Sequence, residues 1–179
     1  MFHQIRSMLE EDGLKLSGKV EVDETYVGGR KKGGKTGFGA KEHKSVVVGA
    51  VARKNSVIAK VVPDVKGKTL IPFVRENVSK EATIYTDELR SYDLLYAHCE
   101  KHERVNHGRK QWVKGDVHTN SIEGFWSLLK GGIRGAHRGR VTKGYMQNYI
   151  NEYAFRYNRR FDETPMFLSF LQQVEKYSD

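Results

Sequence analysis

The stretch KVEVDETYV, residues Lys19–Val27, is the first of three apolar segments that decide the fold. It alternates apolar and polar side chains and is rich in β-branched residues, which is typical of a β-strand. SVVVGAVA, residues Ser45–Ala52, has the composition of a buried strand, and SVIAKVVP, residues Ser56–Pro63, follows it after a turn at Asn55. Consecutive strands joined in this way favour antiparallel pairing. We therefore predict a three-stranded antiparallel meander.

Helices and short strands follow the meander. The predicted elements are, in chain order, a helix at Lys68–Val78, a strand at Ala82–Glu88, a helix at Leu89–His102, a strand at His102–His107, and helices at Asn120–Gly131, Lys143–Asn158 and Thr164–Val174. This order predicts an α/β protein with a mixed sheet of about five strands flanked by helices. A short amphipathic helix that ends near Gly13 precedes the first strand.

The charge balance indicates a polyanionic partner. The chain of 179 residues carries 31 Lys and Arg against 22 Asp and Glu, a net charge of +9. Nucleic acid is the partner that a basic surface of this kind fits best. The single cysteine, Cys99, excludes a disulfide within the chain and fits a reducing cytoplasm. No apolar run reaches the roughly 18 residues that suggest a membrane helix, so we expect no membrane partner.

Two aspartates occupy positions where strands often place catalytic groups. Asp23 lies within the first predicted strand, and Asp87 ends the strand at Ala82–Glu88. Because side chains alternate along a strand, Asp23 should share a face with Glu21 and Thr25. If the two strands are neighbours, both carboxylates can reach one divalent cation, since Mg²⁺ prefers oxygen ligands and takes one or two protein carboxylates. A third acid would complete such a site.

The candidate for the third acid is Glu123, in HTNSIEGFWSLLK, residues His118–Lys130. The apolar residues of this stretch recur with the spacing of one buried helix face. Glu123 lies beside that face, on a helix anchored by its apolar side. The interval of 35 residues between Asp87 and Glu123 suits a site of three acids.

Four segments resemble the DDE transposases of bacterial insertion sequences, in particular the ISXO-like group. They are VEVDETYVGG, YTDE, HTNSIEGFWSLLK and NEYAFRYNR, in this order, and the likeness covers roughly Gly18–Arg160. The resemblance implies a ribonuclease-H-like fold and an Asp, Asp, Glu site that binds Mg²⁺ or Mn²⁺, carried here by Asp23, Asp87 and Glu123. It further implies a metal-dependent polynucleotidyl transferase that cleaves DNA and transfers strands at transposon ends.

The third position of this site has two candidates. Some related groups are described with Asn in place of the final acid, so Asn120 is the alternative to Glu123. Asn120 also fits the N-cap of its helix, because a short polar side chain accepts a hydrogen bond from a first-turn N–H. The interval after Asp87 favours Glu123.

Two basic, glycine-rich segments are predicted to contact DNA phosphates. Lys130 resembles the basic residue that follows the last acid in the family, and the remaining candidates are Arg134, Arg138 and Arg140 after the helix and Arg30, Lys31, Lys32 and Lys35 in the loop after the first strand. That loop contains GRKKGGKT, residues Gly29–Thr36, which fits the phosphate-binding pattern of nucleotide hydrolases. Its continuation does not resemble the start of a helix, which that pattern requires. We therefore expect no nucleotide cofactor.

The chain departs from the family at its N-terminus. ISXO-like transposases usually carry an N-terminal zinc-ribbon or helix-turn-helix segment, whereas residues 1–17 resemble only the helix before the catalytic core. We predict that residues 1–17 are the helical remnant of a missing DNA-binding segment and that residues 18–179 form the catalytic domain. A truncated or catalytically inactive DNA-binding relic, and a ribonuclease-H-type or junction nuclease, remain alternatives. Paired transposon ends would require a homodimer, located in the bacterial cytoplasm with the nucleoid.

Overall fold

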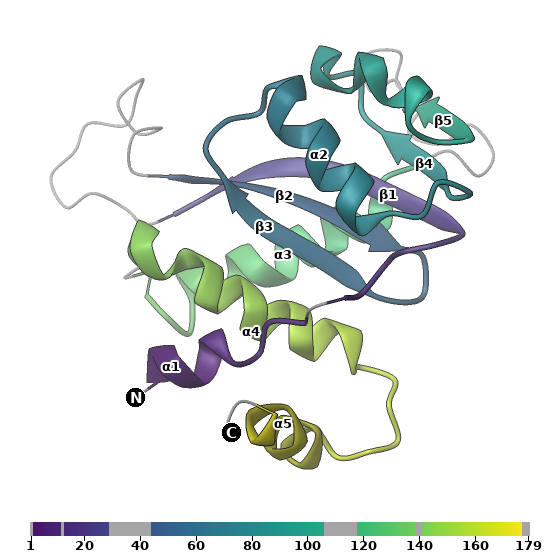
Figure 1. Ribbon diagram of the computed structural model, residues 1–179. Helices are drawn as coiled ribbons and strands as arrows, with labels where there is room; N and C mark the ends of the chain where they lie inside the picture. The colour runs from purple at the N-terminus through teal and green to yellow at the C-terminus, as the bar shows by residue number, and fades with distance from the viewer. Residues whose placement is uncertain (1, 12, 29–43, 106–117, 139–140, 177–179) are drawn as a thin grey trace, which may run out of the picture.

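The centre of the molecule is a mixed sheet of five strands (Figure 1). The computed structural model describes residues 2–11, 13–28, 44–105, 118–138 and 141–176. The strands are β1 (Lys19–Val27), β2 (Ser45–Ala52), β3 (Val57–Val62), β4 (Thr83–Thr86) and β5 (Lys101–Arg104). They lie in the order β3-β2-β1-β4-β5. The predicted α/β class and the predicted strand number are confirmed.

The strand directions divide the sheet into two halves. β1, β2 and β3 pair antiparallel, which confirms the predicted meander. β4 pairs parallel with β1, and β5 pairs parallel with β4. This order and these directions are those of the ribonuclease-H-like fold that the resemblance implied. β1 is therefore the central strand, and β4 is its neighbour on the side opposite the meander.

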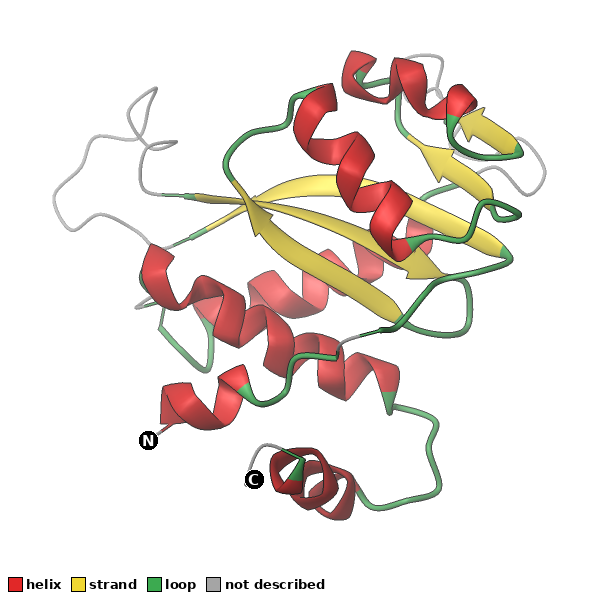
Figure 2. Ribbon diagram, viewed as in Figure 1, coloured by secondary structure: helices red, strands yellow, loops and turns green. Residues whose placement is uncertain are grey.

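Helices cover both faces of the sheet (Figure 2). In this view α2 (Gly67–Asn77) and the 3₁₀ helix η2 (Arg90–Ala97) lie above it, and α3 (Asn120–Arg134) and α4 (Met146–Asn158) lie below it. The short 3₁₀ helix η4 (Lys143–Tyr145) leads into α4. α1 (Phe2–Ser7) packs on α4, and α5 (Met166–Glu175) lies at the edge of the molecule farthest from α2.

Alternate side chains of β1 point into two apolar cores, one on each face of the sheet. Val20 and Val22 are fully buried and belong to the core beneath α2 and η2. Val27 belongs to the opposite core, where Val47 and Val51 of β2 pack against the apolar face of α3. The α3 residues in this core are Ile122, Phe125, Trp126, Leu129 and Ile133, so the predicted buried face of this helix is confirmed. The acids of β1, which are Glu21, Asp23 and Glu24, lie in its central part, between these apolar residues.

The segment between β4 and β5 differs from the prediction. We predicted a helix over Leu89–His102, but the structure has the shorter 3₁₀ helix η2, and β5 begins at Lys101. The buried residues of η2 are Tyr92 and Leu95, which stand three residues apart. That spacing matches the three-residue turn of a 3₁₀ helix. Pairing with β4 then takes Lys101–Arg104 into the sheet.

The N-terminal residues pack against the rest of the chain. Arg6 Nε donates to Glu152 Oε2 of α4 at 2.6 Å, and Asn148 Nδ2 donates to the carbonyl of His3 at 2.8 Å. Leu16 forms a parallel bridge with Val78 at the end of α2. The division into residues 1–17 and 18–179 stays a prediction. Within the described ranges, no helix is both long enough and apolar enough to cross a membrane.

Candidate active site

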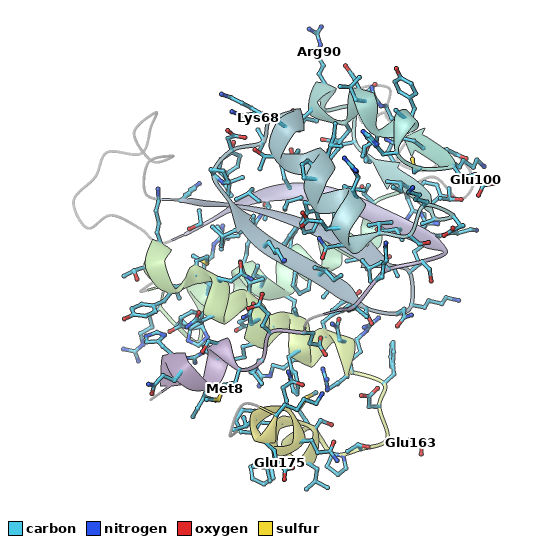
Figure 3. The ribbon with its side chains drawn as sticks, in the orientation of Figure 1. Met8, Lys68, Arg90, Glu100, Glu163 and Glu175 are labelled. Carbon is cyan, nitrogen blue, oxygen red and sulfur yellow. The ribbon has the colours of Figure 1, made fainter. Side chains whose placement is uncertain are left out.

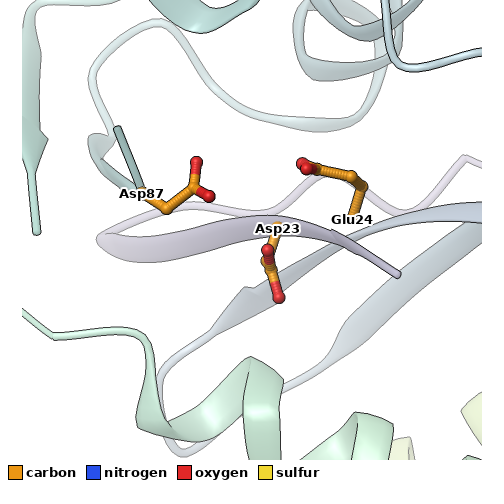
Figure 4. Close-up of side chains that lie close together, drawn as sticks. All are labelled: Asp23, Glu24 and Asp87. Carbon is orange, nitrogen blue, oxygen red and sulfur yellow. The ribbon is translucent and has the colours of Figure 1, made fainter. Parts of the chain in front are cut away.

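Three carboxylates meet where β1 and β4 lie side by side. Asp23 is in the middle of β1, Glu24 follows it, and Asp87 comes directly after β4. One ligand oxygen from each lies within 4.8 Å of the other two, and they are the one group of this kind in the described part of the chain. Figure 4 shows the carboxylates of Glu24 and Asp87 on one side of β1 and that of Asp23 on the other. The parallel pairing of β1 with β4 explains why Asp23 and Asp87 meet.

Asp23 faces α3 and is largely enclosed. Its Oδ2 accepts a hydrogen bond from Trp126 Nε1 at 2.9 Å. Burial is the largest influence on this carboxyl and, with the nearby charges of Asp87 and Glu123, it raises the pKa of Asp23 to about 6, against the opposing hydrogen bonds. A carboxylate that is both desolvated and repelled by other acids favours a proton or a cation.

Glu24 is an acid that we did not predict for this site. Its Oε2 accepts a hydrogen bond from the hydroxyl of Tyr92, a fully buried residue of η2, at 2.8 Å. Burial raises the pKa of Glu24 to about 7, and the charges of Asp87 and Asp23 act in the same direction. Strand alternation places Glu24 on the face opposite Asp23, which is why the sequence pattern separated them. The buried Tyr92 hydroxyl, which needs a hydrogen-bond partner, points to Glu24 only once the structure is known.

Asp87 is held by the turn that follows β4. Its Oδ1 accepts the backbone N–H of Leu89 at 2.9 Å, an arrangement typical of an aspartate that begins a turn. The hydroxyl of Thr86 donates to the carbonyl oxygen of Asp87 at 2.8 Å. Asp87 is half-buried, and its second carboxylate oxygen has none of these turn contacts. The turn therefore fixes the position of the carboxylate and leaves an oxygen for a ligand.

Glu123 lies on the first turn of α3, outside the 4.8 Å group of the three acids. Its charge raises the pKa of Asp23, so the two carboxylates are close enough to interact. The hydroxyl of Thr119 donates to Glu123 Oε1 at 3.0 Å. The side chain is exposed, which leaves it open to a ligand or to DNA.

Asn120, the alternative third residue, is exposed and is the first residue of α3. The N-cap position is occupied by Thr119, so the interpretation of Asn120 as the N-cap was wrong by one residue. The choice between Glu123 and Asn120 stays a prediction.

The predicted DNA contacts lie partly within the described residues. Lys130 is half-buried on α3; burial lowers its pKa, while the charge of Asp23 opposes that shift, which places its ammonium near the acids. Arg134, in the last turn of α3, and Arg138, beyond it, are exposed. Four predicted contacts in the loop after β1, Arg30, Lys31, Lys32 and Lys35, together with Arg140, lie outside the described residues.

The donor set fits a hard divalent cation. Asp23, Glu24 and Asp87 offer carboxylate oxygens alone, and Mg²⁺ and Mn²⁺ prefer such ligands. The raised pKa values of Asp23 and Glu24 show that the cluster concentrates negative charge in a poorly solvated place. A cation between the carboxylates would relieve that repulsion.

Comparison with known proteins places the chain in a family. The family model of the ISXO2-like transposase domain matches residues 15–158. An uncharacterized transposase-like protein of Haemophilus influenzae is 32% identical over 125 residues, which cover 70% of this chain and 98% of that protein. An uncharacterized protein in transposable element ISH50 of Halobacterium salinarum is 29% identical over 157 residues, covering 79% of this chain and 52% of that protein.

Among solved structures, the catalytic core domain of BIV integrase is similar with a TM-score of 0.49 and 11% identity, covering 91% of this chain and 99% of that chain. The family assignment rests on the sequence match, which includes all the acids described above. The chain belongs to the ISXO2-like transposase domain family.

Proposed function

We propose that this chain is a divalent-metal-dependent polynucleotidyl transferase that cleaves DNA at transposon ends and joins the freed strands to target DNA. One observation carries the proposal: Asp23 of β1 and Asp87, directly after the parallel neighbour β4, come together in a transposase-family domain. Within the described residues, none of the three carboxylates forms an ion pair with a lysine or an arginine.

The residues that would hold the metal are Asp23 and Asp87, and Glu123 of α3 would be the third ligand. Mg²⁺ or Mn²⁺, when bound, activates the attacking oxygen and stabilises the leaving oxygen of a phosphodiester. Glu24 adds negative charge beside the metal ligands and keeps its carboxylate fixed through Tyr92. The buried surroundings of Asp23 limit competition from water, which strengthens electrostatic interactions in the site.

The proposed reaction has two steps of the same kind. In cleavage, a water oxygen forms a bond to phosphorus and the bond from phosphorus to the 3′ oxygen breaks, giving a 3′-OH and a 5′-phosphate. In joining, that 3′-OH attacks a target phosphodiester, and the target's own 3′ oxygen leaves with a proton. The number of phosphodiester bonds is unchanged in joining. Neither step needs a covalent bond between DNA and the protein.

The basic residues would position the DNA. Lys130, Arg134 and Arg138 follow Glu123 along and beyond α3, so a phosphate backbone that runs along this helix would contact these cations and reach the acids. We also propose phosphate contacts for Arg140 and for Arg30, Lys31, Lys32 and Lys35. Such contacts carry affinity and register without reading sequence.

The assembly and the location of the protein are part of the same proposal. Two transposon ends must be held together during joining, so we expect at least a homodimer on DNA. We place the protein in the cytoplasm with the nucleoid, where its DNA substrate lies.

A plasmid-nicking assay tests the proposal without knowledge of the transposon ends. Supercoiled DNA is incubated with the protein in Mn²⁺, and the rate of nicking is measured for wild type, Asp23→Asn, Asp87→Asn and Glu123→Gln. Each substitution should lower the rate by at least about 100-fold, the scale on which removal of one charge-stabilising group acts. Glu163→Gln is the matched control, since Glu163 lies in the loop before α5 at the far edge of the molecule (Figure 3).

Each alternative predicts a different result in the same assay. A wild-type protein that binds DNA but does not nick it in Mn²⁺ would be the inactive relic. Faster cleavage of an RNA–DNA hybrid than of duplex DNA would identify a ribonuclease-H-type nuclease. If Asn120→Ala abolishes nicking while Glu123→Gln retains it, the third site residue is Asn120.

A further inference from the structure

Glu21 is a fully buried carboxylate that the proposed reaction does not use. It lies on β1, two residues before Asp23 and on the same face of the sheet, and it has no solvent exposure. An ionised carboxylate is costly to bury unless hydrogen bonds and opposite charge compensate its lost hydration. Its partners therefore indicate why it is there.

Glu21 binds the first turn of α3. Its Oε2 accepts the backbone N–H groups of Ser121 at 2.7 Å and Ile122 at 3.1 Å, and its Oε1 accepts the hydroxyl of Ser121 at 3.0 Å. First-turn N–H groups have no partner within their own helix, and the helix dipole favours a negative charge there. Glu21 thus caps α3 from a strand that lies about one hundred residues earlier in the chain.

The helix lacks the usual cap from its own N-cap residue. Among the described contacts, the Thr119 side chain makes no hydrogen bond to a backbone N–H of α3. Its hydroxyl instead donates to Glu123. Glu21 therefore caps the helix in place of Thr119, and the Thr119 hydroxyl binds the Glu123 carboxylate instead.

Arg53 and His118 complete the enclosure of Glu21. Arg53 Nε donates to Glu21 Oε1 at 2.7 Å, and Arg53 Nη2 donates to the carbonyl oxygen of His118 at 2.9 Å. His118 Nδ1 lies 3.2 Å from Glu21 Oε1. The guanidinium of Arg53 also stacks over the ring of Tyr85 in β4, with its central carbon 4.4 Å from the ring centroid. One carboxylate therefore joins β1 and the end of β2 to the start of α3.

We infer that Glu21 is a positioning residue that holds Glu123 in place opposite Asp23. Glu21 and Asp23 lie on the same face of β1, and Ser121 and Glu123 both belong to the first turn of α3. Fixing that turn to β1 through Glu21 therefore limits how far Glu123 can move from Asp23. The inference rests on the proposed function for its catalytic consequence, but the anchoring itself is a property of the fold.

Amide hydrogen exchange tests the anchoring directly. In Glu21→Gln the side chain keeps its shape, but it loses its charge and replaces one acceptor oxygen by an NH₂ group that faces donors. We expect exchange at Ser121 and Ile122 to become at least about tenfold faster, while exchange at Leu129 and Ile133 stays unchanged. Ser121→Ala, which removes only one of the hydrogen bonds, should give a smaller change at the same amides and keeps the test available if Glu21→Gln does not fold.

Mn²⁺ binding measured by calorimetry, without DNA, tests the consequence for the site. Glu21→Gln should weaken Mn²⁺ binding about tenfold and lower kcat for nicking, because the metal ligands lose their alignment. KM for DNA should stay unchanged, because the surface that contacts DNA is not altered. Ile133→Val is the matched control: it thins the packing at the other end of α3 and should leave Mn²⁺ affinity at the wild-type value.

The outcomes separate this inference from the proposed function. Unchanged exchange at Ser121 and Ile122, or equal acceleration along the whole of α3, overturns the positioning role. Mn²⁺ affinity that falls as much in Ile133→Val as in Glu21→Gln also overturns it. If wild type binds no Mn²⁺, the proposed function fails, and the exchange measurement alone then decides whether Glu21 anchors the helix.

Discussion

The indole Nε1 of Trp126 donates a hydrogen bond to Oδ2 of Asp23 at 2.9 Å, which ties the apolar face of α3 to an acid of the sheet. The ring reaches Asp23 by lying over Gly49, the residue opposite Asp23 on β2. A Cβ at Gly49 would stand 2.6 Å from Cη2 of Trp126. A single glycine therefore lets a large core residue approach the strand closely enough to hold an acid of the candidate site.

Trp126→Phe is expected to lower the rate of nicking more than it lowers the stability of the fold. Phenylalanine keeps much of the apolar contact but removes the donor, and this hydrogen bond lowers the pKa of Asp23. Its loss should raise that pKa, so the rise of nicking rate with pH should move to higher pH. A rate about tenfold lower near pH 7 should accompany a stability loss of roughly 1.5–3 kcal/mol, the range for a hydrogen bond to a charged group. A pH–rate profile identical to that of wild type would contradict this role.

Gly49→Ala is expected to destabilise the protein by about 1–3 kcal/mol, the usual cost of overpacking a core. The added methyl group would displace Trp126 and move its Nε1 away from Asp23. Urea unfolding measures the change. Gly124→Ala is the matched control, because a Cβ at Gly124 meets nothing within 4 Å and alanine favours a helix interior. A neutral Gly49→Ala would show that Trp126 does not need the close approach.

The metal-free protein should lose stability as pH rises through the ionisation of Asp23 and Glu24. Burial, the largest cause, raises the pKa of Asp23 from 3.8 to about 6 and that of Glu24 from 4.5 to about 7. Both carboxyls thus bind protons more tightly in the folded chain than in the unfolded chain. Stability should therefore fall between about pH 4 and pH 7, by up to roughly 3 kcal/mol for each carboxyl at the usual 1.36 kcal/mol per pKa unit. Urea unfolding in a chelating buffer measures it.

Two comparisons isolate the cause of this pH dependence. Glu24→Gln should flatten the profile and stabilise the metal-free protein near neutral pH, since a neutral amide does not repel Asp23. Saturating Mn²⁺ should raise the free energy of unfolding of the wild-type protein at the same pH, because the ionised carboxylates then bind a cation. A wild-type profile that matches that of Glu24→Gln would show that the cluster does not carry the predicted repulsion.

Arg134→Ala and Arg138→Ala should weaken DNA binding in proportion to the phosphates they contact. Each lost contact should reduce the slope of log affinity against log salt concentration by about 0.9, with little dependence on DNA sequence. Fluorescence anisotropy at several salt concentrations measures the slope. Lys80→Ala is the control, since Lys80 is an exposed lysine beyond the end of α2. An unchanged slope for both arginine variants would show that Arg134 and Arg138 do not contact DNA phosphates.

The sequence was sufficient to predict the sheet and two of the acids, for a clear physical reason. Alternation identified β1, apolar composition identified β2 and β3, and the meeting of Asp23 with Asp87 needed only the parallel pairing of β1 with β4. Glu24 was missed because strand alternation assigns it to the opposite face. Asp87 lies beyond the end of β4, in a turn, so strand alternation does not decide on which face its side chain lies. Its carboxylate therefore comes close to both Asp23 and Glu24.

The anchoring of α3 could not be predicted from local patterns. Alternation placed Glu21 on the face of Asp23, but its partners, Arg53, Ser121 and Ile122, come from distant parts of the chain. A buried carboxylate of this kind looks like a solvated strand residue in the sequence. The predicted helix over Leu89–His102 failed for a related reason: pairing with β4 took its last residues into the sheet as β5.

A crystal of the wild-type chain soaked in Mn²⁺ tests the central claim most directly, because manganese is located by its anomalous scattering. We expect a peak between the carboxylates of Asp23 and Asp87, with coordinating oxygens at about 2.0–2.2 Å, close to the distances for Mg²⁺. The peak should be absent in Asp23→Asn crystals soaked in the same way. Manganese bound elsewhere, with no density between Asp23 and Asp87 of the wild type, would contradict the assignment of the site.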